Sequence, residues 1–279
     1  MDVPTLSAVK MAEGGEGWTH PFSKRKSLCV VTGGSRGFGR SVAVALAEEV
    51  ARGSHIVVLG RNSESLRDTE KLSKAMSPHI QITTLFGDLS KCSVTGSIFA
   101  CLRFQVDPTD YDHALLVNNA GSVGNVSRRT WEHGDPQELD SYFNLNVASA
   151  VSLTAKFLEF VRPGNLTCTI VNVTCDEAHR PMKCHSLYCA GKAAREMMFR
   201  VMAQEEPHLR ILSYNPGPLE TELKTTVMVE AADAEVREEI RRLRDDNQLI
   251  DPDVSARKLV QLLKEDLFKS GEIVNFHES

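Results

Sequence analysis

Residues 32–39 read Thr-Gly-Gly-Ser-Arg-Gly-Phe-Gly. This glycine-rich stretch directly follows a short apolar run and leads into a segment with helical periodicity. Gly33, Gly37 and Gly39 allow the backbone to turn tightly and to approach a pyrophosphate, which the free N–H groups and the dipole of the next helix would stabilise. A strand before such a motif and a helix after it are the context that a dinucleotide site requires. We therefore predict that residues 32–39 bind the phosphates of a dinucleotide.

Short β-branched runs alternate with longer helical patterns from residue 28 onwards. This alternation is typical of βαβ units on a parallel sheet, and continuously apolar runs are typical of strands that are covered on both faces. We expect an α/β fold, a single Rossmann-type doubly wound parallel sheet with helices on both faces, over residues 28–279. The expected strands are residues 28–31, 56–59, 80–86, 114–117, 169–173, 211–214 and 273–276. The expected helices are residues 41–51, 63–76, 93–104, 137–161, 185–206, 232–247 and 252–265.

The composition is that of a globular protein. Of the 279 residues, 42% are hydrophobic and 25% are charged, and 18 glycines with 11 prolines are too few for a fibrous or linker protein. An α/β protein of this length commonly forms one domain. Residues 1–27 show neither the helical nor the strand period and mix Gly, Ser, Pro and charged residues, so we expect a flexible N-terminal extension there.

The charge pattern excludes several classes of partner. The net charge is -5, and no basic stripe is present of the kind that nucleic acid requires. No apolar run approaches the roughly 18 residues needed to span a membrane. Seven cysteines, an odd number without zinc-type spacing, indicate a reducing compartment and no metal site. We therefore expect a cytoplasmic protein that binds neither nucleic acid nor membrane.

The residues after the second expected strand bear on the type of dinucleotide. A site that prefers NAD usually has an acidic residue there to hold the ribose 2′-hydroxyl, whereas this chain has Gly60-Arg61-Asn62. A guanidinium can grip a 2′-phosphate in bidentate fashion, and Arg36 in the glycine-rich stretch could add a second positive charge. The pattern favours NADP(H). The alternative is that Arg61 only begins a solvated loop.

Two residues with helical spacing are candidates for proton transfer. Tyr188 and Lys192 stand four residues apart in a helical pattern, so both side chains fall on one face. A free phenol has a pKa of about 10, but a nearby ammonium and an oxidised nicotinamide both favour the phenolate and lower that pKa. We predict that Tyr188 is a general acid. Taken alone, the two residues could equally be a surface pair.

Three motifs together resemble the short-chain dehydrogenase/reductase family across residues 28–276. They are the glycine-rich stretch, Asn118-Asn119-Ala120-Gly121, and Tyr188 with Lys192 four residues later. The resemblance implies an oxidoreductase whose catalytic Asn, Ser, Tyr and Lys correspond to Asn146, the position of Cys175, Tyr188 and Lys192. Asn146 would support a proton-relay water. The cofactor-binding residues expected from the motifs and the resemblance are Gly33, Ser35, Arg36, Gly37, Phe38, Gly39, Arg61, Asn62, Asp88, Leu89, Asn119, Ala120, Gly121, Tyr188, Lys192, Pro216, Gly217, Leu219 and Thr221.

Within that family, residues 32–40, 187–195, 214–221 and 268–271 are most similar to a branch that reduces pterin side-chain carbonyls with NADPH, in the formation of tetrahydrobiopterin. This implies a small carbonyl substrate, a pterin, that contacts Cys175, Tyr188, Gly217 and Asn275. It also implies a homodimer through helices 137–161 and 185–206, residues 219–224 that fold over the nicotinamide and its phosphates, and a substrate cleft walled by a helical segment at 227–247. The alternative is a diverged NADP-binding protein with weak or no pterin reductase activity, which serves as a binding or regulatory protein or acts on other small carbonyls.

The match departs from the family at two positions on the substrate side. The family's serine lies 13 positions before the tyrosine, where this chain has Cys175, and a thiol is a weaker hydrogen-bond donor than a hydroxyl. Thr174 or Ser186 could supply a hydroxyl instead, and Cys175 could alternatively be a reactive thiol activated by Lys192. At the C-terminus, Asn275 stands where the pterin reductases carry an aspartate, so pterin affinity should fall.

Overall fold

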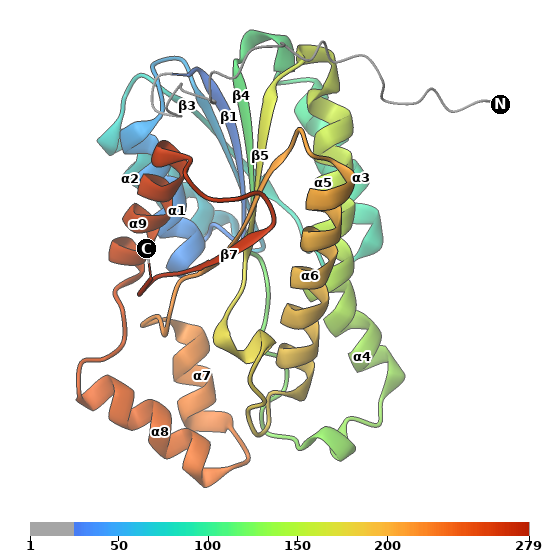
Figure 1. Cartoon of the computed structure of the whole chain (residues 1–279), viewed down its shortest axis with the longest axis vertical. Coiled ribbons are helices and arrows are strands. Elements are labelled where there is room, and N and C mark those ends of the chain that lie inside the picture. The colour runs from blue at the N-terminus through green and yellow to red at the C-terminus, as the bar shows by residue number, and fades with distance from the viewer. Residues whose placement is uncertain (1–24, 279) are drawn as a thin grey trace, which may run out of the picture.

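The computed structural model describes residues 25–278. The expected N-terminal extension therefore lies outside the described residues, apart from its last three positions. Within the described range the chain forms a seven-stranded parallel sheet in the order β3-β2-β1-β4-β5-β6-β7, with helices on both faces (Figure 1). This arrangement confirms the Rossmann-type fold.

All seven expected strands form, each with ends within two residues of those expected. The strands β1, β2 and β4 in the centre of the sheet are buried at every position, whereas the edge strand β3 is half-buried. Complete burial explains why these strands have no polar alternation. The strands are β1 Ser27–Thr32, β2 His55–Gly60, β3 Gln81–Phe86, β4 His113–Asn118, β5 Thr167–Val173, β6 Arg210–Asn215 and β7 Glu272–Asn275.

The helices differ from expectation at three places. The first begins inside the glycine-rich stretch, at Gly37 rather than at residue 41. The expected helix 137–161 is interrupted by a π-helical turn, Asn144–Ala148. The expected segment 227–247 forms two helices that residues 231–233 separate. The helices are α1 Gly37–Glu49, α2 Ser63–Met76, α3 Cys92–Arg103, α4 Pro136–Phe143, α5 Ser149–Val161, α6 Ser186–Glu205, α7 Glu222–Glu230, α8 Ala234–Asp245 and α9 Pro252–Glu265.

Apolar side chains fill a core on each face of the sheet. On one face, Val42 and Leu46 of α1 pack with Leu259 of α9. On the other face, Leu153 and Phe157 of α5 lie in a cluster with residues of α3 and α6. Burial of apolar surface on this scale is the main driving force for the fold.

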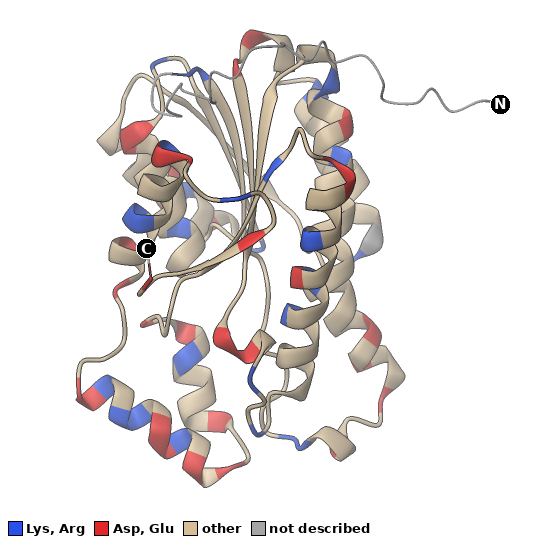
Figure 2. Ribbon diagram, in the orientation of Figure 1, with Lys and Arg blue, Asp and Glu red and all other residues tan. Residues whose placement is uncertain are grey.

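Helices α7 and α8 project beyond the carboxyl ends of the strands, at the bottom of Figure 1. They have a small apolar core of their own, in which Val227 and Ile240 pack with Val123 and Val126 from the loop after β4. We call α7 and α8 the lid. Charges of both signs alternate along α8, as expected for a solvated helix (Figure 2).

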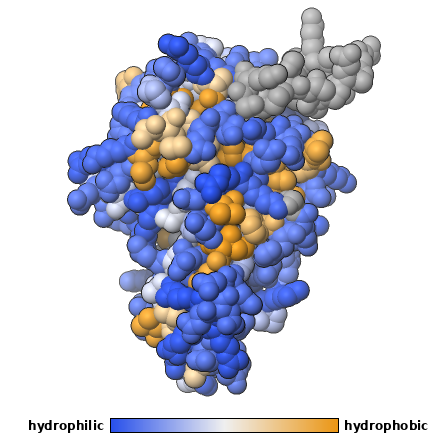
Figure 3. Space-filling model, turned by 90° about the vertical axis from the view of Figure 1, so that its left-hand side faces the viewer, coloured by the Kyte–Doolittle hydropathy of each residue, from blue (hydrophilic) through white to orange (hydrophobic). Residues whose placement is uncertain are grey.

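The side of the molecule shown in Figure 3 is mostly hydrophilic, and hydrophobic residues gather in a band across its middle, above the lid. None of the described helices is long and apolar enough to span a bilayer.

Candidate active site

The glycine-rich stretch forms a tight turn between β1 and α1. Gly33 and Gly37 have φ values of +67° and +52°, a conformation that favours glycine. A Cβ at Gly39 would lie 2.4 Å from both the carbonyl oxygen of Gly33 and the side-chain nitrogen of Asn119. The side chain of Asn119 donates to the carbonyl of Thr32 over 2.8 Å. Glycine is therefore required here by backbone conformation and by close packing.

A cavity of about 1490 Å³ runs from this turn to the lid. It opens at the carboxyl ends of the strands, beside β1, where the sheet order reverses; ligands of open α/β sheets bind at this kind of place. Most of the expected site residues line it. These are Gly33, Ser35, Arg36, Gly37, Phe38, Gly39, Arg61, Asn62, Leu89, Asn119, Ala120, Gly121, Cys175, Tyr188, Lys192, Pro216, Gly217, Leu219 and Thr221.

Three expected residues, Asp88, Asn146 and Asn275, lie outside that lining. The carboxylate of Asp88 accepts hydrogen bonds from the backbone and the hydroxyl of Ser90. Asn275 accepts from Asn215 over 2.9 Å and donates to Glu278 over 2.5 Å. The polar groups of Asp88 and Asn275 are therefore hydrogen-bonded to other residues of the protein.

Asn146 lies in the π-helical turn between α4 and α5, and it is buried. Its side-chain oxygen accepts from the backbone N–H of Ser122 over 2.8 Å, and its nitrogen donates to the carbonyl of Tyr142 over 3.0 Å. The π-helical turn thus places Asn146 against the loop after β4, and its role at a proton-relay water stays a prediction.

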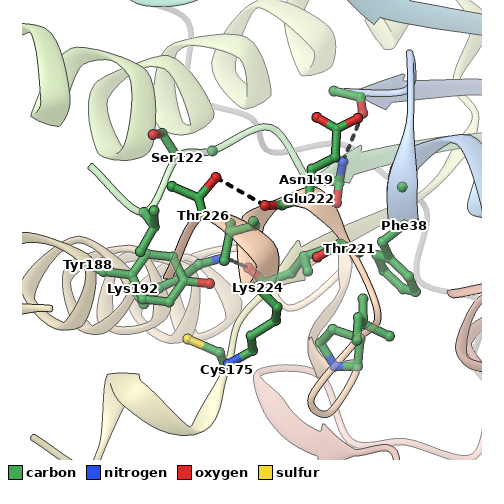
Figure 4. Close-up of a pocket in the computed structure, with 18 of the residues that line it drawn as sticks. Phe38, Asn119, Ser122, Cys175, Tyr188, Lys192, Thr221, Glu222, Lys224 and Thr226 are labelled. Atoms are coloured by element: carbon green, nitrogen blue, oxygen red, sulfur yellow. Dashed lines mark hydrogen bonds between the residues drawn. The ribbon is translucent and has the colours of Figure 1, made fainter. Parts of the chain in front are cut away.

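Tyr188 and Lys192 lie on α6 and face the same cavity (Figure 4). The Lys192 ammonium donates to the carbonyl of Val173 over 2.8 Å and lies 5.5 Å from the centroid of the Tyr188 ring. Burial, with the nearby charge of Arg195, lowers the pKa of Lys192 to about 8. Lys192 is therefore still mostly protonated at neutral pH.

The pKa of Tyr188 moves in the opposite direction from the expected one. Burial raises it well above its ordinary value, and the neighbouring Cys175 and Glu177 raise it further. The expectation rested on the Lys192 ammonium together with an oxidised nicotinamide, and that ammonium donates to a backbone carbonyl rather than to the phenol. A raised pKa keeps Tyr188 protonated across neutral pH, which is the form that can donate a proton.

The thiol of Cys175 interacts with three other groups of the site. Lys192, Glu177 and Tyr188 all interact electrostatically with the thiol, and all four side chains line the same cavity. Burial raises the pKa of Cys175 to about 12, although the charge of Lys192 lowers it. The thiol is therefore protonated at neutral pH, which argues against the alternative of a reactive thiolate.

Neither candidate hydroxyl takes the place of the missing serine. Thr174 is buried and donates to Glu196 over 2.9 Å. The hydroxyl of Ser186 is buried without a hydrogen-bond partner among the described residues, and Ser186 lies outside the cavity lining.

Residues 27–232 match the short chain dehydrogenase family. This span contains the glycine-rich turn, the loop after β4 and the Tyr188–Lys192 pair. The chain belongs to that family. It is also 39% identical to the sepiapterin reductase of Bos taurus over 254 residues, which cover 91% of this chain and 95% of that protein.

More distant relatives agree with the family assignment. The benzil reductase ((S)-benzoin forming) of Bacillus subtilis strain 168 is 28% identical, over 90% of this chain and 98% of that protein. Among solved structures, the KRED1-Pglu enzyme superposes with a TM-score of 0.76 at 21% identity, covering 89% of this chain and all of that one. This last similarity shows the fold alone. As a short-chain dehydrogenase, the chain is an oxidoreductase.

Sequence reasoning missed several residues of this short-chain dehydrogenase site. Glu177 lines the cavity and forms an ion pair of 3.5 Å with Lys224, the last residue of the expected segment 219–224. Tyr142 has a buried hydroxyl with no hydrogen-bond partner among the described residues, and its ring lies against Gly124 and Gly191. Its spacing of four from Asn146 was an available signal, since such residues share a helix face.

Arg195 is the other missed residue, and it is 1% exposed. It donates to the side-chain oxygen of Asn172 and to the carbonyls of Asn118 and Ala120, over 3.0, 2.5 and 3.2 Å. Arginine is rarely buried unless its donors are paired, as they are here. These bonds connect α6 to the carboxyl ends of β5 and β4.

Proposed function

We propose that the chain is an NADPH-dependent carbonyl reductase of the sepiapterin reductase type, which reduces side-chain carbonyls of pterins in tetrahydrobiopterin formation. The observation that carries this proposal is the position of Tyr188, a protonated phenol beside the Lys192 ammonium, in the same cavity as the glycine-rich turn. The similarity to a benzil reductase supports small dicarbonyls as further substrates.

The residues present fit a dinucleotide. The turn at Gly33 and Gly37 leaves no Cβ between the backbone and the cavity, and the N-terminus of α1 begins there, where an anion is stabilised. Arg61 is exposed at the cavity edge and would hold a 2′-phosphate, with Arg36 beside it. Arg36 forms an ion pair with Glu222 of the lid, so the phosphate would compete with that carboxylate. NADP(H) is therefore the proposed cofactor.

Different side chains of the cavity would perform different parts of a carbonyl reduction. NADPH supplies the hydride when it is bound. Tyr188 transfers its proton to the carbonyl oxygen, and the Lys192 charge, 5.5 Å from the ring centroid, stabilises the phenolate that remains. The Cys175 thiol lines the same cavity beside the phenol and would contact the same oxygen. A thiol is a weaker hydrogen-bond donor than a hydroxyl, so it would polarise the carbonyl less.

A second candidate function is a diverged NADP-binding protein with little pterin reductase activity. The thiol at the family's serine position and the position of Asn275 outside the cavity lining favour it. The double substitution Cys175→Ser with Asn275→Asp separates the two functions. A rise of about tenfold or more in turnover of sepiapterin supports the diverged protein, since one oxyanion donor is worth about that much or more.

We also propose a cytoplasmic homodimer. Met197, Met198 and Val201 form an apolar face on α6, with exposed fractions of 55%, 46% and 44%, which a second copy would cover. Six cysteines of the described chain are free thiols, which fits a reducing compartment.

Consumption of NADPH by the purified protein tests the proposed function. We expect turnover with sepiapterin, with benzil, or with both. Absence of NADPH consumption with either substrate, while NADPH still binds, would exclude a carbonyl reductase and leave the binding protein.

A further inference from the structure

Glu177 and Lys224 form an ion pair inside the cavity, with side chains that are 13% and 15% exposed. Glu177 belongs to the short turn after β5, and Lys224 comes from α7 of the lid. Burial alone would raise the pKa of Glu177, but the Lys224 ammonium and the Cys175 thiol lower it. The carboxyl group is therefore ionised, and the cavity contains a full negative and a full positive charge side by side.

This pair lies next to the position where the carbonyl reacts. Glu177 stands two residues after Cys175 and lines the same cavity as Tyr188, and its charge acts on both the Cys175 thiol and the Tyr188 phenol, so the carboxylate lies close to the proton donor. Figure 4 shows the Lys224 side chain reaching across the cavity towards Cys175. A group bound by the pair would therefore be attached close to the reacting carbon, and not at the far end of a bicyclic substrate.

Both partners keep unused hydrogen-bonding capacity. A carboxylate offers about four acceptor positions and an ammonium three donors. Among the described residues, the ammonium of Lys224 donates a hydrogen bond to one acceptor, the carboxylate of Glu177. An ion pair held in a partly buried place contributes little to stability, because desolvation offsets the attraction. Both side chains line the cavity, so their remaining donors and acceptors are available to a molecule bound there.

We propose that Glu177 and Lys224 recognise a second oxygen on the carbon next to the reacting carbonyl. Lys224 donates a hydrogen bond to that oxygen, whether it is a carbonyl or a hydroxyl. Glu177 accepts a hydrogen bond from it when it is a hydroxyl. The site thereby selects α-hydroxyketones and vicinal dicarbonyls over simple ketones. This inference rests on the proposed function, because it assumes that Tyr188 marks the reacting carbonyl.

Three diaryl compounds with one skeleton provide the test: benzil has two adjacent carbonyls, benzoin has a carbonyl and a hydroxyl, and deoxybenzoin has one carbonyl. Calorimetric titration of the protein without bound nucleotide gives the dissociation constants without any turnover, because neither a hydride donor nor a hydride acceptor is present. We expect benzoin to bind at least about tenfold more tightly than deoxybenzoin, as for a hydrogen bond to a charged group. In Glu177→Gln this ratio should fall to within about twofold, and in Lys224→Met the preference for benzil over deoxybenzoin should fall in the same way.

Two further variants control for general effects on the fold. The double variant Glu177→Gln with Lys224→Met leaves neither charge unpaired, and it should lose both preferences. The matched variant Glu70→Gln with Lys74→Met removes an ion pair of 2.6 Å on α2, outside the cavity lining, and should keep both.

The outcomes separate this inference from the proposed function. Equal binding of benzoin and deoxybenzoin by the unaltered protein, or a preference that survives in the double variant, overturns the role of the pair even if NADPH is consumed. Failure to consume NADPH, with the binding preference present and lost in the variants, overturns the proposed function and leaves the recognition of the second oxygen standing.

Discussion

The hydroxyl of Thr174 donates a hydrogen bond of 2.9 Å to the carboxylate of Glu196, and both side chains are buried. The same carboxylate lies 2.9 Å from a ring nitrogen of His179. Thr174 lines the cavity, but its hydroxyl is committed to Glu196 of α6 and cannot bond a substrate without leaving that buried carboxylate one donor short. The side chain at the family's serine position is the Cys175 thiol, and the rate of reduction should depend on it.

Replacing Cys175 with serine should raise turnover, because a hydroxyl is the stronger donor to the carbonyl being reduced: by less than about tenfold if the protein is a carbonyl reductase as it stands, and by about tenfold or more if it is the diverged protein. Steady-state NADPH consumption with a dicarbonyl measures this. Cys101→Ser, on the exposed side of α3, is the matched control and should change nothing. An unchanged rate in Cys175→Ser would show that the carbonyl is polarised by another group.

Replacing Tyr188 with phenylalanine should lower turnover by about 10²- to 10⁴-fold, since the ring stays but the transferable proton is lost. The affinity for NADPH, measured by nicotinamide fluorescence, should change little and serves as the control for folding. Activity close to that of the unaltered protein would mean that the proton comes from elsewhere.

Replacing Arg61 with alanine should weaken NADPH binding by about tenfold and leave NADH binding nearly unchanged, because only NADPH carries the 2′-phosphate. Fluorescence titrations with both nucleotides give the ratio. Arg67→Ala on α2 removes the same charge from a residue outside the cavity lining and should have no such effect. If both nucleotides lose affinity equally in Arg61→Ala, the discrimination lies at another residue.

Two buried histidines should make the fold sensitive to mild acid. Burial lowers the pKa of His55 to about 4 and that of His113 to about 3, both below the ordinary value of 6.5. Above pH 6.5 both are neutral in either state and stability is complete. As the pH falls from there towards 4, the unfolded chain binds protons that the folded chain does not. Each histidine therefore lowers the free energy of unfolding by up to about 1.4 kcal/mol for each pH unit.

Urea unfolding at a series of pH values measures that slope. The variant His113→Gln should lose about half of the dependence, whereas substitution of the exposed His208 should retain it. A free energy of unfolding that stays constant between pH 6.5 and 5 would contradict the assignment to these two groups.

The apolar face of α6 should hold two copies together. Met198→Glu places a charge in that interface and should shift the protein from dimer to monomer in sedimentation equilibrium. Met76→Glu, on α2, adds the same charge to another exposed methionine and should leave the dimer intact. If the unaltered protein is a monomer, the proposed dimer is wrong. If the dimer tolerates Met198→Glu, the interface lies on another face.

Most of the fold, and the part of the cavity that would hold the cofactor, could be predicted from the sequence. The central strands are buried on both faces, so each is a continuous apolar run that is visible without tertiary information. The turn at Gly33 and Gly37 is equally local, because backbone conformation and close packing dictate the residue type.

The remainder depends on contacts between distant segments. The π-helical turn at 144–148 contains neither glycine nor proline, and Asn146 is held there by Ser122, 24 residues away in sequence. Glu177 and Lys224 are 47 residues apart in sequence, and they meet only because the fold places α7 of the lid beside the turn after β5. The burial of Arg195 contradicts the usual tendency of its residue type, so no pattern in the chain indicates it.

Arg195 lies two helical turns after Tyr188 on α6, and its guanidinium binds the backbone next to Asn119, which lies under the cofactor half of the cavity. Buried hydrogen bonds thus join the helix of the proposed acid to the proposed floor of the nicotinamide site. In the proposed reaction, the alignment of proton donor and cofactor would therefore already be set by the fold before a substrate enters.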